Sequence, residues 1–315
     1  MGRGDPVTTV TPTAAHDAAT SSAGPETTSP ARRTAALLPW LGLLPFAVFA
    51  ALFLLLPTLL AVGSGFVDGD GALTFHNIAA LADPVILLTF WNTVWVSALT
   101  AIIGALVGAL VCYAMLGLRE DGATRRTVDA ASGVLAQFGG VMLAFAFIAT
   151  IGNQGVVTVL LRETIGFDLY ADGPWIYDLP GLIMPYVYFQ VPLMVITFMP
   201  ALAALKPQWA EANLTLGGTR GSFWAHVGFP VLAPSFAACL LLLFANAFSS
   251  YATAAALVSQ GAPIVPLQIR AALTSETVLG RENLAGALAL GMIVVVAIVM
   301  WGYSAIQKRT ARWQR

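Results

Sequence analysis

Few residues in this 315-residue chain have the types and spacing that catalysis requires. The only lysines, Lys206 and Lys308, are followed by proline and arginine, so the sequence contains no G-x-x-x-x-G-K-[ST] phosphate loop. The three histidines, His16, His76 and His226, lie on separate segments and form no metal-binding pattern with cysteine. No serine has the G-x-S-x-G surroundings of a nucleophile elbow. We therefore predict no catalytic residue, no metal site and no bound cofactor, and expect that the chain is not an enzyme.

The composition predicts a membrane protein. The chain is 58% hydrophobic and 10% charged, with a mean hydropathy of +0.79, whereas soluble domains carry about 25% charged residues. A net charge of -1 gives no basic footprint for nucleic acid. The two cysteines, Cys112 and Cys239, lie inside apolar runs and are interpreted as small core residues rather than a disulfide framework.

Six apolar runs approach or exceed the roughly 20 residues that cross a bilayer, which predicts an all-α protein with six transmembrane helices. The third run is the weakest, because it contains Gln137 and a Gly139–Gly140 pair. The fourth contains Pro185, Pro192 and Pro200, which are tolerated only if neighbouring groups satisfy the freed carbonyls. The predicted spans are 37–63, 88–117, 129–151, 180–204, 231–257 and 284–306.

The chain ends differ from this apolar part. Residues 1–34 are rich in Ala, Thr, Ser, Pro and Gly, a composition that predicts a disordered tail. A cleaved signal peptide is the rival interpretation, but the following apolar run is longer than the 7–15 residues of a signal-peptide core. We expect a six-span domain over 35–307 and a short basic tail over 308–315.

The basic residues predict the orientation, because they avoid translocated loops. With the amino terminus inside, twelve of the fifteen lysines and arginines fall on inside segments. Only Arg162, Arg270 and Arg281 fall outside, so both termini are predicted to be cytoplasmic. The segment 206–230 then becomes a cytoplasmic loop. The outside segments 64–87, 152–179 (with a short helix at 154–164) and 258–283 either contact an external partner or are solvated connections.

The predicted spans contain neutral polar residues but no firm acid or base, which argues against a proton-coupled carrier. Such side chains either line a water-filled path or hydrogen-bond between helices, and for single residues both interpretations stay open. The dense stretch "NAFSSYAT" at 246–253 favours the path. Gly104 and Gly108 form a G-x-x-x-G pair, typical of a close-packing helix face. The candidate pathway residues are Asn92, Gln137, Gln190, Asn246, Ser249, Ser250 and Tyr251.

The loop 206–230 has the pattern of two short helices at an angle. Trp209, Ala212 and Leu216 recur at helical spacing, and Gly217 with the next glycine then breaks the helix. A second helix over 220–228 would place Phe223 and Val227 on one side, before the next span begins at Pro230. On this pattern alone, an interfacial amphipathic connector explains the loop equally well.

The exact residues of this loop resemble the "EAA" loop of permease subunits from binding-protein-dependent ABC importers. The positions that match the motif are Glu211, Ala212, Gly217, Arg220, Val227 and Pro230. The chain departs from the motif at Asn213, where a second alanine is usual, at Gly218, often alanine, and at Trp224, often phenylalanine. The stretch "NTVWVSALTAIIGALVGALVCYAM" from residue 92 also resembles this family. The resemblance implies the type I ABC importer permease fold over about 36–307.

The resemblance also implies partners. The loop would be the coupling helix that sits in a groove of a cytoplasmic ATPase subunit, with Glu211 as the polar anchor and Gly217 as the kink. ATP and magnesium would be bound by two such ATPase subunits. A second permease subunit, forming a heterodimer, and an extracytoplasmic binding protein would complete an importer in the bacterial inner membrane.

The cargo is less sharply indicated. The stretch "FANAFSSYATAAALVSQGAPIVPLQIRAAL" at 244–273 is most similar to the polyamine, iron and thiamine branch of the family, with phosphonate and sugar importers less similar. We therefore expect a spermidine/putrescine-type polyamine or another small solute. Two rival hypotheses remain, namely an ion-coupled secondary transporter without ATPase partners and a membrane scaffold that transports nothing.

Overall fold

The computed structural model describes residues 42–119, 121–258, 263–274 and 282–311. The described part is helical, and its only extended pairing is the isolated bridge between Val67 and Leu73. It divides into two compact units, one up to Leu56 and one from Pro57 onward. The all-α prediction is confirmed. The predicted tail over 1–34 and the last four residues lie outside the described part.

Six helical stretches in the described residues are long and apolar enough to cross a membrane, which confirms the predicted number. Four of them agree with predicted spans to within about five residues, including Pro84–Met115, which is helix α4, and Leu179–Ala203, which contains α8 (Ile183–Ala203). The other two differ. The six stretches are Gly42–Ser64, Pro84–Met115, Val141–Ile165, Leu179–Ala203, Arg220–Phe248 and Asn283–Ser304.

The predicted third span, 129–151, is wrong as a single helix. The chain forms α5 (Ala123–Leu135), leaves the helix, and resumes as α6 (Val141–Ile151) and α7 (Val156–Ile165). The cause is Gly140, whose φ of 76° lies in the left-handed region that only glycine adopts without strain. The apolar stretch therefore begins at Val141, and α7 agrees with the short helix predicted over 154–164.

The predicted fifth span, 231–257, is also interrupted. Helix α11 (Phe229–Phe248) ends before the serine pair, and a separate helix, α12 (Ala252–Leu257), follows. Hydroxyl side chains next to the backbone compete with the helical bonds. The side chain of Ser249, which donates to the Ala245 carbonyl at 2.9 Å, is one such case.

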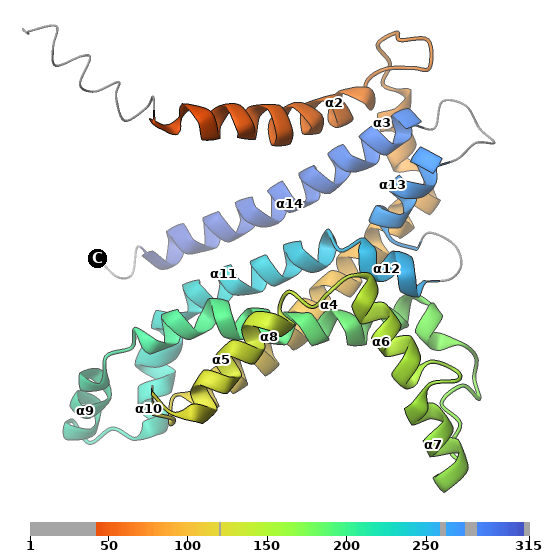
Figure 1. Cartoon of the computed structure of the whole chain (residues 1–315). Coiled ribbons are helices and arrows are strands. Elements are labelled where there is room, and N and C mark those ends of the chain that lie inside the picture. Colours follow the sequence, from red (N-terminus) through yellow and green to blue (C-terminus); the bar gives the residue numbers. More distant parts are fainter. Residues whose placement is uncertain (1–41, 120, 259–262, 275–281, 312–315) are drawn as a thin grey trace, which may run out of the picture. The chain divides into compact units, whose positions relative to one another are not determined.

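Helix α4 is the centre of the larger unit and packs mainly against α8 and α11 (Figure 1). A Cβ atom at Gly104 would lie 2.7 Å from the Cβ of Gln190, and one at Gly108 would lie 2.5 Å from the Cβ of Met194. Real Cβ atoms do not approach so closely, so only hydrogen fits at both positions. The G-x-x-x-G pair is therefore the close-packing face that the sequence predicts.

Buried hydroxyl groups follow the same helix and are satisfied locally. The side chain of Thr89 donates to the carbonyl of Val85 at 2.8 Å, and Thr93 donates to the carbonyl of Thr89 at 2.7 Å. The Thr93 oxygen also accepts a bond from the backbone N–H of Val265, at the start of α13 (Val265–Thr274), at 2.9 Å. These bonds satisfy the buried hydroxyls of Thr89 and Thr93, so this polar face of α4 can be buried.

The last long helix, α14 (Glu282–Ala311), packs against α13 and α11. Its residue Leu288 is fully buried and joins Ile86 of α4 and Val265 of α13 in a small apolar cluster. Helices α9 (Pro207–Thr215) and α10 (Arg220–Phe223) lie at one end of this unit, and α6, α7 and α12 lie at the opposite end (Figure 1). The two candidate sites below therefore occupy opposite ends of one bundle.

Replacing Gly108 by alanine tests the α4–α8 contact. The added methyl group would meet both the Met194 side chain and the Val191 carbonyl at 2.9 Å or less, so the helices must separate. We expect a loss of about 1–3 kcal/mol in the free energy of unfolding, the usual cost of overpacking, measured by denaturation in detergent. Gly133→Ala in α5 is the matched control, because no atom lies within 4 Å of its added Cβ. Equal stability of the two variants would show that α4 and α8 do not pack closely at Gly108.

Candidate functional site

The loop predicted to contact a partner has one short helix rather than two. Helix α9 begins with Pro207 at its first turn and ends before Gly217. The predicted second helix over 220–228 is wrong as a separate element, because α10, a π-helical turn (Trp224–Gly228) and α11 continue without a break. A π-turn changes which carbonyls the following N–H groups reach, and it lets the helix pass Pro230, which has no N–H to donate.

The end of α9 is closed by a Schellman motif. Gly217 has a φ of 79°, and its N–H donates to the Leu214 carbonyl at 3.0 Å, while the N–H of Gly218 donates to the Asn213 carbonyl at 2.8 Å. This pair of bonds satisfies carbonyls that a helix end otherwise leaves free. Gly217 is therefore required by the backbone geometry of this turn. This agrees with its predicted role as the kink after the first helix.

Two of the three departures from the motif, Asn213 and Gly218, lie against each other. A Cβ atom at Gly218 would lie 2.5–2.7 Å from the side-chain amide of Asn213. That amide donates to the Thr219 carbonyl at 2.9 Å, and the Thr219 hydroxyl caps the next helix by accepting from the N–H of Ser222 at 3.2 Å. Asn213 and Gly218 thus form one contact in the turn that joins α9 to the helix beginning at Arg220.

Of the remaining motif residues, some lie in solvent and others line a groove beside α9. Glu211 and Arg220 are exposed. Ala212 and Val227 both line a groove of about 390 Å³, together with Trp209, Asn213, Leu216 and Val231. Leu216 nevertheless remains 88% exposed. Trp209, Ala212 and Leu216 thus share the side of α9 that borders this groove, but all three remain exposed.

At the other end of the bundle, the two interrupted spans meet. The N–H of Gly140, where α6 begins, donates to the Thr253 hydroxyl of α12 at 2.9 Å. The hydroxyl of Tyr186 in α8 donates to the carbonyl of Ser250, within the second interruption, at 2.9 Å. Each interruption frees backbone groups that the membrane interior cannot hydrate, and side chains of neighbouring helices satisfy two of them.

The predicted pathway residues are spread around these interruptions. Gln137, Asn246, Ser249 and Tyr251 are exposed, and Ser250 is half-buried. Two others lie elsewhere. Asn92 is half-buried on α4, and Gln190 is fully buried between α4 and α8. The side-chain nitrogen of Gln190 donates to the Thr100 hydroxyl at 3.0 Å.

Sequence reasoning missed the residues that hold the interruptions together. Tyr186 carries no signal in the sequence, and Thr253 stands out only as part of the polar stretch "NAFSSYAT" at 246–253. Gly140 was treated as a weakness of a span, although a glycine pair inside an apolar run is also a signal for a helix break. Its partner, 113 positions away in the chain, has no such signal.

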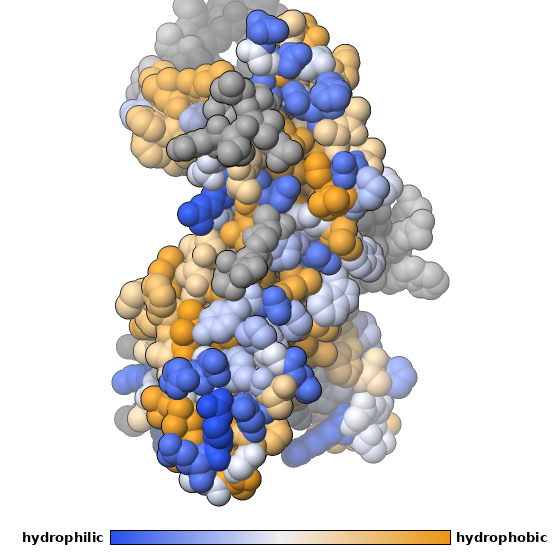
Figure 2. Space-filling view, turned by 90° about the vertical axis from the view of Figure 1, so that its right-hand side faces the viewer, coloured by the Kyte–Doolittle hydropathy of each residue, from blue (hydrophilic) through white to orange (hydrophobic). Residues whose placement is uncertain are grey.

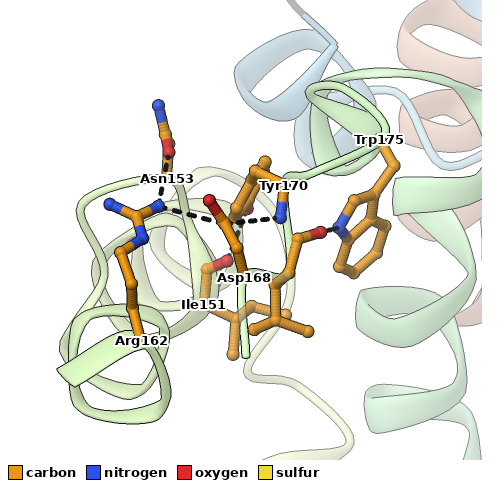
Figure 3. Close-up of polar contacts among 7 residues, drawn as sticks. Ile151, Asn153, Arg162, Asp168, Tyr170 and Trp175 are labelled. Carbon is orange, nitrogen blue, oxygen red and sulfur yellow. Dashed lines mark hydrogen bonds and ion pairs between the residues drawn. The ribbon is translucent and has the colours of Figure 1, made fainter. Parts of the chain in front are cut away.

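The segment after α7 is an ordered cap with its own polar network (Figure 3). Arg162 pairs with Asp168 at 3.1 Å, and the same carboxylate accepts the N–H of Tyr170 at 2.9 Å. The Trp175 indole donates to the Leu169 carbonyl at 3.0 Å and stacks on Tyr170 with ring centroids 6.2 Å apart. The Tyr170 N–H and the Arg162 guanidinium hold the pKa of Asp168 below its usual value, whereas burial raises the pKa of Tyr170.

Figure 2 looks at the end of the molecule that carries this cap, and hydrophilic residues gather there among the hydrophobic ones. In the described residues, no three His, Cys, Asp or Glu side chains come together as a metal site would require. This end therefore carries hydrophilic groups on its surface, while Tyr170 and Trp175 pack half-buried against the core.

No protein-family model matches the chain, but individual proteins do. "Probable ABC transporter permease protein y4fN" of Sinorhizobium fredii is 25% identical over 216 residues, which cover 68% of this chain and 37% of that protein. Ferric transport system permease protein FbpB of Actinobacillus pleuropneumoniae is 27% identical over 101 residues, covering 32% and 14%. Sulfate transport system permease protein CysT of Escherichia coli is 29% identical over 85 residues, covering 27% and 29%.

The fold also matches solved structures. A bacterial ABC transporter involved in the import of the acidic polysaccharide alginate superposes with a TM-score of 0.70, at 17% identity, over 89% of this chain and 98% of that chain. The MetNI methionine ABC transporter in inward-facing conformations gives 0.52 at 15% identity, over 73% and 99%.

Together these likenesses confirm the predicted resemblance to ABC transporter permeases, and the chain has the fold of ABC importer permeases. The chain spans only 14 to 37% of the length of the three sequence relatives named above. With six apolar helices, it is a multi-pass protein of the bacterial inner membrane.

The Asn213–Gly218 contact predicts a compensating pair of substitutions. Gly218→Ala alone should destabilise the loop by about 1–2 kcal/mol, because its methyl group meets the Asn213 amide. Adding Asn213→Ala should recover part of this loss, since the space is then free. A double-mutant cycle on the denaturation midpoint in detergent measures the coupling. Strictly additive effects of the two substitutions would show that the contact is absent.

Proposed function

We propose that this chain is the permease subunit of an ATP-driven importer, forms half of its translocation path, and is moved by a cytoplasmic ATPase through the loop 206–230. The observation that carries the proposal is the connection of this loop to a span. From Arg220 to Phe248 the backbone is helical without a break, so a force on the loop is transmitted directly to α11. We further propose that residues 35–307 form the six-span permease domain.

In this proposal the exposed side of α9 is the coupling surface. Glu211 is exposed and has no basic partner among the described residues, so its carboxylate is free to accept hydrogen bonds from an ATPase subunit. The positive φ of Gly217 sets the angle at which α9 leaves the long helix. Arg220 marks the start of the helix that leads into α11, Ala212 and Val227 line the groove beside α9, and the exposed Pro230 lies in the first turn of α11.

The motor in this proposal is a pair of separate ATPase subunits that bind ATP and magnesium. The sequence has no phosphate loop of its own, so energy must come from a partner. The orientation with both termini and this loop in the cytoplasm follows from the distribution of basic residues and belongs to the same proposal.

The translocation path is proposed to pass the interrupted spans. Asn246 exposes a polar side chain on the otherwise apolar α11, and Gln137 and Ser249 expose theirs in the turns that follow α5 and α11. A lipid environment would not satisfy these groups. A second permease subunit, on the opposite side of the path, would close it, and we propose a heterodimer. Ser250 and Tyr251 belong to the same surface, whereas the buried Gln190 and the half-buried Asn92 would support it through packing between helices.

An external binding protein is proposed to dock on the cap after α7. One of the solved structures with the same fold is described as a transporter in complex with an alginate pentasaccharide-bound periplasmic protein, with a TM-score of 0.69 and 17% identity over 89% of this chain and 96% of that chain. The ordered network around Asp168 and Trp175 suits this role, because a pre-organised surface loses little entropy when it binds a partner.

For the cargo we propose the polyamine, iron and thiamine branch, with a spermidine/putrescine-type solute as its first member to test. A ferric permease among the relatives supports this branch, and the sulfate permease and the alginate importer keep other small solutes and sugars open. An ion-coupled secondary carrier is not favoured, since the sequence relatives found are named as ABC or transport-system permeases.

The coupling surface is tested in the assembled transporter. Glu211→Ala should lower substrate-stimulated ATP hydrolysis roughly tenfold, because a charge-assisted hydrogen bond is lost. Gly217→Pro should do the same, since proline cannot adopt a positive φ. Gln208→Ala, an exposed change on the same helix, is the matched control. Full stimulation in both variants, with normal membrane insertion, would refute the coupling role.

The path is tested by Asn246→Leu, which replaces an exposed polar side chain with an apolar one of similar size. We expect substrate uptake into proteoliposomes to fall several-fold while basal ATP hydrolysis persists, because the path loses a hydrogen-bonding group. Ala238→Leu, at an exposed position of the same helix, serves as control. Unchanged uptake in the Asn246 variant would remove this residue from the path.

A further inference from the structure

A groove at the loop-bearing end of the bundle is not used by the function proposed above. This lateral groove opens between α4, α8 and the start of α11 and has a volume of about 570 Å³. That volume lies within the roughly 300–1,000 Å³ of typical ligand sites. Its walls include Leu106, Leu110, Tyr113, Phe198, Trp224 and Phe229.

We propose that the lateral groove binds an acyl chain of an anionic phospholipid, with the phosphate of the head group against Arg220. The groove is a binding site for one membrane lipid, and the ligand class follows from its lining, its opening and the charge at its end.

The lining suits hydrocarbon and nothing polar. The side chains that line the groove are all apolar or aromatic, and the one hydroxyl among them is that of Tyr113. The Tyr113 ring packs edge-on against Trp224 with centroids 5.4 Å apart. Tyrosine and tryptophan at the end of a span are typical of the level where acyl chains meet head groups.

The groove is open along the side of the bundle. Leu106 is 56% exposed, and Leu110 and Phe229 are each 67% exposed. All three lie on helices long and apolar enough to cross the membrane. Lipid chains therefore reach the groove directly, without passing through water.

The charge at this end favours an anionic head group. Arg220 lies one turn before Trp224 on the same helix, and its carbonyl accepts the Trp224 N–H. It is exposed, and the described residues provide it with no acidic partner. Arg119, which follows α4, is also exposed. Basic side chains beside spans are the usual sites for anionic head groups on the cytoplasmic side.

A bound lipid would act on the connection between loop and span. Trp224 begins the π-helical turn, and its ring lies over Gly228 so closely that a Cβ atom there would be 2.5 Å from it. An acyl chain beside Trp224 fills space that this ring could otherwise enter, and so holds the turn in place. This regulatory effect rests on the function proposed above, whereas lipid binding itself does not.

Binding is tested on the purified chain by native mass spectrometry after delipidation and titration with phosphatidylglycerol. Ala233→Trp places an indole in the groove, because Ala233 lines it at an exposed position. We expect phosphatidylglycerol affinity to fall roughly tenfold. Ala238→Trp, an exposed change on the same helix outside the groove, should leave it unchanged.

The head group is tested in the same experiment by Arg220→Gln, which should abolish the preference for phosphatidylglycerol over phosphatidylcholine. Arg126→Gln, at an exposed arginine that already pairs with Asp121 at 3.6 Å, is the control. Equal lipid retention by wild type and Ala233→Trp would overturn the proposal. Loss of chain–chain association in Ala233→Trp, with lipid retention intact, would overturn it in favour of a protein helix in the groove.

Regulation is tested in the assembled transporter in nanodiscs. Raising the phosphatidylglycerol fraction should change substrate-stimulated ATP hydrolysis in wild type and not in Ala233→Trp. Lipid binding without any effect on stimulated hydrolysis would overturn the regulatory part alone. Absence of stimulation in wild type in every lipid would instead count against the proposed function, so the two failures are distinguishable.

Discussion

The rest of the structure depends on the contact between α4 and α8. Hydrogen atoms at Gly104 and Gly108 let the two helices approach so closely that the Cβ atoms of Gln190 and Met194 fill the space where side chains would stand. This contact places Thr100 within 3.0 Å of the Gln190 amide. It also brings α8 and α11 to the same side of α4, and the lateral groove lies between them.

A membrane domain must satisfy its own backbone groups, and this requirement explains the paired interruptions. A single break in α11 would leave carbonyls unpaired in a region without water. Here Tyr186 bonds the Ser250 carbonyl, and Thr253 accepts the N–H of Gly140 from the other broken span. Each break thus helps to stabilise its partner, and exposed polar side chains lie beside both breaks.

The loop 206–230, at the opposite end of the bundle, is held together by its backbone geometry. The Schellman motif at Gly217 ends α9 without a free helix end, and the Asn213–Gly218 contact locks the turn. The helix that begins one residue beyond Thr219 continues to Phe248, so the second half of the loop and the span form one continuous helix. The lateral groove lies beside Trp224, at the π-turn that leads into α11.

The sequence alone determined the number of spans, the all-α class, the close-packing face at Gly104 and Gly108, and the need for glycine at Gly217, because apolar length and backbone freedom are local properties. It could not determine that the third and fifth predicted spans are broken. Helix ends inside apolar runs depend on which partners satisfy the freed groups, and those partners are far apart in the chain. Likewise, Asn213 and Gly218 looked like two separate departures from a motif. Only the tertiary structure decided that they form one contact, since the turn at Gly217 folds one back onto the other.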